Sequence, residues 1–202
     1  MFRRMEQYSI DGRGRGEVYI TLAVASLALA YAAHQVIDLL PFHIPWWIEV
    51  PSFVVWFGVV NITFDRWLWR VRVAGMRLSA VPDFSGEWHG TIAAVNAESQ
   101  KIELPVDVRI EQTWSAIEVR GKTSRGITRS KIAGVRIEDE ELRYEYETQP
   151  DVFDATAKHH VGFCVLELHE QNLLEGFYYT LDGTSTKGVI ALRRGTQASP
   201  SK

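Results

Sequence analysis

The chain has 202 residues, a formal net charge of −3 and one cysteine, Cys164. The small negative charge excludes a broad basic surface for polymeric nucleic acid. The single cysteine excludes an internal disulfide framework and favours a reducing compartment. The average composition conceals two unlike halves: residues 18–69 are apolar and rich in tryptophan, whereas residues 80–195 are charged and alternating.

Five segments follow from this division. They are a basic cytoplasmic N-terminus (1–17), a two-helix transmembrane hairpin (18–69), a linker (70–83), a β-barrel (84–195) and a flexible tail (196–202).

The hairpin is predicted from two uncharged runs. Residues 18–37, "VYITLAVASLALAYAAHQVI", carry no charge, and twenty helical residues cover about 30 Å, the thickness of a bilayer core. After the proline-broken "PFHIPWW", residues 50–64 form a second, shorter uncharged run. That run needs tryptophans at both interfaces, supplied by Trp46, Trp47, Trp67 and Trp69. The alternative is a signal peptide followed by a buried helix, because "ALAYAA" resembles a cleavage site.

Arginines set the predicted orientation. Four arginines precede the first run, four lie at or beyond the end of the second, and the connecting loop has no lysine or arginine. The positive-inside rule then places both termini in the cytoplasm. Within the runs, His34, Asn61 and Thr63 are polar, and we expect them to line a contact between helices of an oligomer.

The C-terminal half predicts an eight-stranded antiparallel up-and-down β-barrel. Short turn signals such as "NAESQK", "IEDEE" and "LDGTS" separate alternating segments, and even spacing favours closure. The expected strands are 84–95, 103–112, 115–123, 127–137, 140–148, 158–169, 172–181 and 186–194. Such a barrel has room for side chains or for one small ligand.

Alternation assigns side chains to the two faces of each strand. Trp88 points inward between Gly86 and Gly90, and we expect it to plug the barrel. In the fourth strand, Ile132 is predicted to face inward and Ala133 outward. The inward set is unusually polar, which suits a nucleobase or a phosphate. The candidate ligand-binding residues are Gln112, Thr128, Ser130, Tyr144, Tyr146, His160, Tyr178, Thr180 and Arg194. Arg194 has two alternatives, phosphate binding or packing across the Trp88 ring.

Gly86-Glu87-Trp88 and the late Arg194 resemble the G-x-W…R signature of lipocalin-type barrels. The whole layout resembles the two-transmembrane β-barrel effectors of bacterial cyclic-oligonucleotide antiphage signalling (CBASS). The stretches that carry this resemblance are "FSGEWHG", "RIEQTW", "LRYEYE", "HHVGF" and "LEGFYYT…KGVIALRR".

The resemblance implies a multi-pass protein of the bacterial inner membrane. Its barrel would bind a cyclic dinucleotide from a partner nucleotidyltransferase, homo-oligomerise, disrupt the membrane and kill the infected cell. The residues that match are Tyr146, His160, Tyr178 and Arg194, with Thr128 and Ser130 as further candidates.

Other functions remain as alternatives. A membrane-tethered lipocalin-like carrier would need an apolar interior, and a ligand-free interaction scaffold would need a filled one. We expect no catalysis, cofactor or metal, because the sequence has no catalytic motif and His159 and His160 face opposite ways on one strand.

Overall fold

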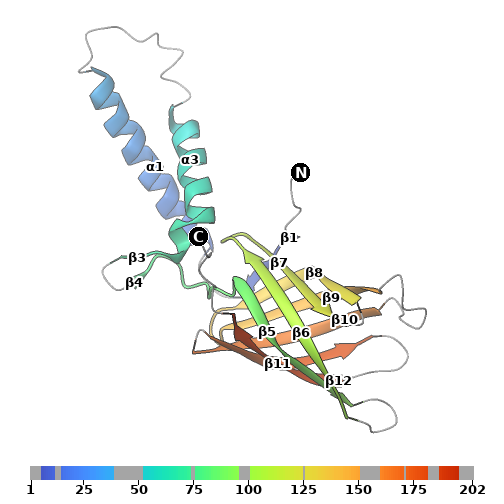
Figure 1. Cartoon of the computed structure of the whole chain (residues 1–202). Helices are drawn as coiled ribbons and strands as arrows, with labels where there is room; N and C mark the ends of the chain where they lie inside the picture. Colours follow the sequence, from blue (N-terminus) through green and yellow to red (C-terminus); the bar gives the residue numbers. More distant parts are fainter. Residues whose placement is uncertain are drawn as a thin grey trace, which may run out of the picture. The chain divides into compact units, whose positions relative to one another are not determined.

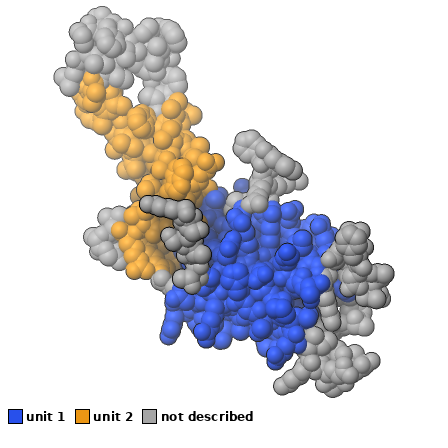
Figure 2. All heavy atoms as spheres, in the orientation of Figure 1, with its two compact units in different colours: residues 1–12, 81–202 blue, residues 13–80 orange. Residues whose placement is uncertain are grey.

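The computed structural model describes residues 6–11, 15–38, 52–73, 76–95, 101–124, 126–150, 160–170, 172–181 and 187–195. The chain forms two compact units (Figure 2). One comprises residues 1–12 and 81–202, and the other residues 13–80. The first unit is therefore built from both ends of the chain.

The eight predicted strands are present, each with ends within two residues of its expected bounds. They are β5 (Gly86–Val95), β6 (Lys101–Gln112), β7 (Ala116–Thr123), β8 (Gly126–Arg136), β9 (Glu141–Pro150), β10 (His160–His169), β11 (Leu173–Thr180) and β12 (Lys187–Arg194). Their order is β7-β6-β5-β12-β11-β10-β9-β8, every pairing is antiparallel, and a β7–β8 pairing closes the barrel (Figure 1).

Two further short strands, which the sequence analysis did not anticipate, join this sheet. β1 (Glu6–Gln7) pairs antiparallel with β7, and β2 (Ser9–Asp11) pairs parallel with β8. Direct pairing between β7 and β8 covers only Arg120–Thr123 and Gly126–Arg129. The N-terminal segment thus completes the barrel wall where β7 and β8 are not paired with each other.

A β-bulge in β8 corrects one face assignment. The register shifts between Ser130 and Ile132, so that Ile132 lies opposite Glu145 and Ala133 opposite Tyr144. Ile132 is 65% exposed and Ala133 only 5%. The prediction that Ile132 faces inward and Ala133 outward was wrong, because the extra residue of a bulge inverts the alternation beyond it.

One half of the barrel interior is filled with hydrocarbon. Leu142 lies opposite Leu166, and Leu174 lies opposite both Leu168 and Leu192. Leu142, Leu166, Leu174 and Leu192 are fully buried. We call this end, where β5, β7, β9 and β11 begin, the leucine half. Trp88, fully buried, belongs to it and donates from Nε1 to the carbonyl of Phe84 at 2.9 Å.

The second unit contains two helices, α1 (Arg15–Asp38) and α3 (Ser52–Arg66), which contact each other. The 3₁₀ turn η1 (Leu68–Arg70) and a hairpin of β3 (Arg72–Val73) and β4 (Met76–Arg77) follow. Within the described residues, α1 alone is long and apolar enough to span a membrane. α3 extends about 22 Å at 1.5 Å per residue, so the second predicted span is present as a helix but is shorter than a bilayer core. The loop tryptophans Trp46 and Trp47 lie outside the described residues.

Candidate functional site

Three rows of cross-strand neighbours line the other half of the barrel interior. The first row contains Tyr178, Cys164 and Tyr144. The second contains Thr180, Gly162, Tyr146 and Ser130. The third contains His160, Thr148 and Thr128. We call these rows together the polar half. They come from four adjacent strands, β8 to β11, and successive rows are about 7 Å apart along a strand.

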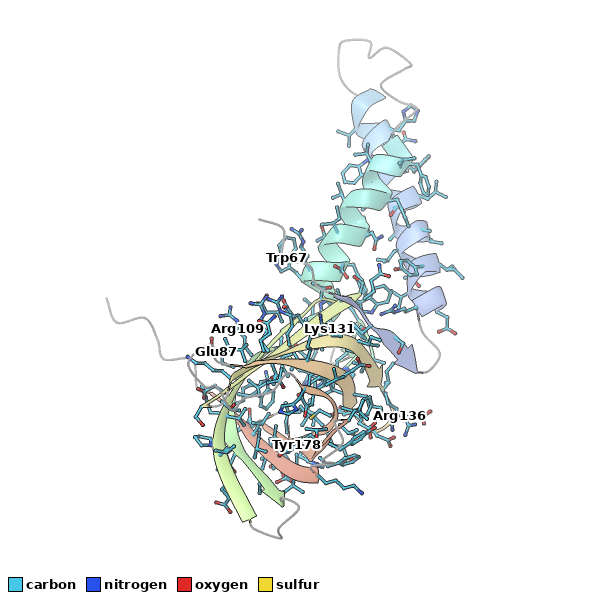
Figure 3. All side chains as sticks on the ribbon, turned by 90° about the vertical axis from the view of Figure 1, so that its right-hand side faces the viewer. Trp67, Glu87, Arg109, Lys131, Arg136 and Tyr178 are labelled. Atoms are coloured by element: carbon cyan, nitrogen blue, oxygen red, sulfur yellow. The ribbon has the colours of Figure 1, made fainter. Side chains whose placement is uncertain are left out.

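Seven of the nine predicted ligand-binding residues therefore lie together. They are Thr128, Ser130, Tyr144, Tyr146, His160, Tyr178 and Thr180. Tyr144, Tyr146 and Ser130 are buried, and the other four are partly exposed. Figure 3 shows Tyr178 within the ring of strands and Arg136 on its outside.

Glycines make room for the side chains of this half. A Cβ on Gly162 would overlap the ring of its cross-strand neighbour Tyr146, and one on Gly188 would overlap that of Tyr178. The two tyrosine rings therefore lie against the wall over neighbouring glycines, which is how aromatic residues cover glycine in sheets. This arrangement explains why the inward positions combine glycine with large aromatic residues.

The buried hydroxyls and the thiol of the polar half are neutral at physiological pH. Burial raises the pKa of Tyr144 well above its ordinary value, and the pKa of Tyr146 likewise. Burial also raises the pKa of Cys164 to about 12, although a hydrogen bond with Tyr144 opposes the shift. The group thus offers hydrogen bonds and ring faces without bringing negative charge to an anionic ligand.

Two predicted residues lie at the opposite end of the barrel. Gln112 is buried; its Oε1 accepts from the Phe84 amide at 2.8 Å, and its Nε2 donates to the Pro82 carbonyl at 3.0 Å. Arg194 lies over the Trp88 ring at 4.6 Å and donates to the Asp83 carbonyl at 2.9 Å. Both residues hold the segment that leads into β5.

Distance separates these two residues from the polar half. Arg194 is six residues beyond Gly188, the β12 neighbour of Tyr178, which is about 20 Å along the strand. Of the two alternatives for Arg194, the structure shows packing across Trp88.

Besides Gly162, which has no side chain to contribute, two residues of the polar half were not among the predicted set. Thr148 continues the inward series of Leu142, Tyr144 and Tyr146, and this alternation was the available signal. Cys164 lies between Tyr144 and Tyr178 in its row, and an inward position on a strand was its only signal.

A hollow of about 340 Å³ lies elsewhere, on the outer face of the barrel. Ser9, Ile132, Arg136 and Phe163 are among the residues that line it. None of the predicted ligand-binding residues does, and alternation from the buried rows places its polar side chains outside the barrel. We therefore base the candidate site on the three rows.

The predicted membrane contacts lie in the second unit. His34 is exposed on α1, and Asn61 and Thr63 are partly buried on α3. Their role in an oligomer stays a prediction.

The barrel is thus closed, with leucines filling one half of its interior and hydroxyls, an imidazole and tyrosine rings lining the other, and a barrel of this size can hold one small ligand. A family model for the cyclic dinucleotide receptor domain of Cap15 matches residues 79–194. The chain belongs to this family, the receptor domains of CBASS effectors, as its resemblance implied. A comparison with curated proteins found no match.

Proposed function

We propose that the polar half of the barrel binds the cyclic dinucleotide. The observation that carries this proposal is the gathering of seven predicted residues from β8 to β11 into three adjacent rows. A chain that needed only a stable core would continue the leucine packing of the other half through these positions.

The chemistry of the rows suits this ligand. The faces of Tyr146 and Tyr178 offer stacking surfaces for bases, and Thr128, Thr180 and His160 offer hydrogen bonds to base edges and phosphate oxygens. A carrier of an apolar molecule would need an apolar interior, whereas the inward side chains of these rows are mostly polar. This polarity argues against the lipocalin-like carrier.

The path of the chain supports a membrane hairpin. Residues 6–11 pair with β7 and β8, and the chain returns to the same sheet at Gly86. Both ends of the intervening segment therefore lie on one side of any membrane, and helices that cross it must do so an even number of times. We infer that the chain crosses the membrane twice, once through α1 and once through a segment that includes α3. Both termini then lie in the cytoplasm of a bacterium.

The surfaces of both helices support the same inference. Large apolar side chains are exposed around them, including Ile20, Val24, Leu27, Tyr31, Val54, Val55, Val59 and Ile62. Helices that are apolar on all sides are stable when lipid or protein covers them. On α3, Asn61 and Thr63 would then lie at membrane depth, where polar groups favour contacts between helices.

The proposed activity is a ligand-driven assembly. A partner nucleotidyltransferase supplies the cyclic dinucleotide, and the ligand shifts the chain towards an oligomer that it binds more tightly than the monomer. Association of the hairpins then disrupts the inner membrane and ends the infection with the death of the cell. No chemical step is proposed for the barrel.

The test uses the full chain in lipid nanodiscs and a panel of cyclic dinucleotides in calorimetric titration. Tyr178→Phe removes one inward hydroxyl and should weaken binding about threefold to tenfold, the worth of one hydrogen bond. Tyr179→Phe is the matched control, because the next residue on β11 faces outward and pairs with Phe163. Unchanged affinity in the double variant Tyr146→Phe/Tyr178→Phe would rule out the proposed site.

A further inference from the structure

The wall of the barrel has a gap that the N-terminal segment fills. β7 and β8 pair directly over four residues each, at the end of the barrel that contains the polar half. Towards the leucine half they are separated, and Ile117 and Ala116 of β7 pair with Glu6 and Gln7 instead. On the other side, Gly134–Arg136 of β8 pair with Ser9–Asp11. We call this gap the seam.

A buried side chain, that of Tyr8, anchors the segment in the seam. Tyr8 is 2% exposed, and its hydroxyl donates to the carbonyl of Trp114 at 2.8 Å. Ser9 lies close against the bare backbone of Gly134, where a Cβ would lie 3.0 Å from its Oγ. The backbone pairings of the segment number two on β7 and three on β8, far fewer than any barrel strand makes. The segment is thus specifically seated but lightly held.

Without the segment, the facing edges of β7 and β8 would present unpaired backbone groups. Such edges bind a strand of matching pattern. Every copy of the chain carries the same segment and the same seam, so residues 6–11 of a second copy fit this seam by identity, as in other exchanges of an element between protomers. In the sequence, Gly-Arg-Gly separates Asp11 from α1, and glycine permits the backbone angles that a change of direction requires.

The seam also contacts the candidate ligand site. Ser130 belongs to the second row of the polar half, and its Oγ accepts a hydrogen bond from the Val119 amide at 2.9 Å. The bulge in β8 begins at this residue, beyond the last direct β7–β8 pair. The hydroxyl of Ser130 can still donate one hydrogen bond and accept a second. A ligand that binds Ser130 would therefore contact the same residue that ties β7 to β8 beside the seam.

We propose that the seam is a binding site for residues 6–11 of a second copy, and that ligand-driven assembly proceeds by exchange of this segment between copies. The inference rests on the proposed function for its ligand. Its partner is the chain itself, and its docking surface is the pair of strand edges in Ala116–Ile117 and Gly134–Arg136.

The experiment uses two full-length chains of different size in the same lipid vesicles, one with Gln7→Cys and one with Ala116→Cys. These positions are register partners, and the native Cys164 is buried. Addition of the cyclic dinucleotide should produce a disulfide between the two chains. Its yield should be at least tenfold higher than the yield from a Gln7→Cys chain mixed with a Glu175→Cys chain. Glu175 is exposed on β11 and serves as the matched position outside the seam.

A second variant locks the segment in its own chain. Gln7→Cys/Ala116→Cys in one copy should form an internal disulfide without ligand, bind ligand, fail to assemble, and recover assembly after reduction. Strand exchange is overturned if the oxidised variant assembles fully. It is also overturned if a lysine-reactive crosslinking assay detects oligomers while the disulfide between the two chains is absent. Either result leaves the proposed function intact. No oligomer with any cyclic dinucleotide overturns both.

Discussion

Gln112 provides the sharpest test of how the barrel interior is divided. Its side-chain amide is 5% exposed and bonds to both the Phe84 amide and the Pro82 carbonyl. Gln112→Met keeps the length of the side chain and removes both partners. Two buried backbone groups are then left unsatisfied, at about 1–3 kcal/mol each, so we expect a loss of about 2–6 kcal/mol. This is a large fraction of a typical stability of about 5–15 kcal/mol.

The assay is denaturant unfolding of the full chain in detergent, followed by tryptophan fluorescence, with ligand titration on the same samples. Gln149→Met is the control, because Gln149 is an exposed residue of β9. If Gln112→Met unfolds like the wild type and yet loses ligand affinity, Gln112 belongs to the ligand site and the division into two halves is wrong.

Two further predictions concern the interior. The folded-state pKa of Cys164 is raised to about 12 from an ordinary 9.0, so its contribution to stability is full below pH 9 and is lost as the pH rises towards 12. Unfolding free energies measured from pH 7 to 11 should therefore fall above pH 9, and they should fall less steeply in Cys164→Ala. Gly90→Ala would place a Cβ on the carbonyl oxygen of Ala191 and should cost about 3 kcal/mol or more in a thermal melt. Gly58→Ala in α3, where a Cβ would have open space, should be neutral or stabilising. Equal melting temperatures for the two variants would contradict the close approach of the Ala191 carbonyl to Gly90.

The strands could be predicted because two local signals agree. Alternation gives the inward face, and turn residues give the ends, so β9 and β11 were located from "LRYEYE" and "LEGFYYT" alone. The bulge at Lys131 was not predictable in this way, since one extra residue leaves no trace in composition and inverts every assignment beyond it.

The N-terminal strands were missed for a different reason. "EQYSID" is too short for a periodic signal, and its pairing partners lie more than 100 residues away in the sequence. Tyr8 precedes an apolar run, where an aromatic residue is typical of a membrane interface. Its burial between two barrel strands depends on tertiary structure that no local pattern contains.

The sequence predicted which face of its strand each candidate residue occupies, but not its position along the barrel axis. Alternation places Gln112, Arg194 and Tyr178 all inside the barrel, yet it does not say how far along the axis each one lies. The position along the barrel axis follows from the direction of each strand. β6 and β12 end at the end of the barrel where β9 and β11 begin. The last inward residues of β6 and β12 therefore lie at one end of the barrel, and the last inward residues of β9 and β11 lie at the other. The nine candidates therefore separate into seven residues at one end and two at the other.

This separation has a physical reason. A small barrel has too little interior to tolerate many unpaired polar groups, because the hydrophobic contribution grows with the apolar area that it buries. The leucine half, with the tryptophan plug and the arginine across it, concentrates that area at one end. Two parts of the chain are fixed at this end. Residues 6–11 are held by the hydrogen bond from Tyr8 to the Trp114 carbonyl, and the residues that lead into β5 are held by the hydrogen bonds of Gln112 with Pro82 and Phe84. The two stretches of the barrel unit that lead into and out of residues 13–80 are thus both fixed at the leucine half, away from the proposed ligand site.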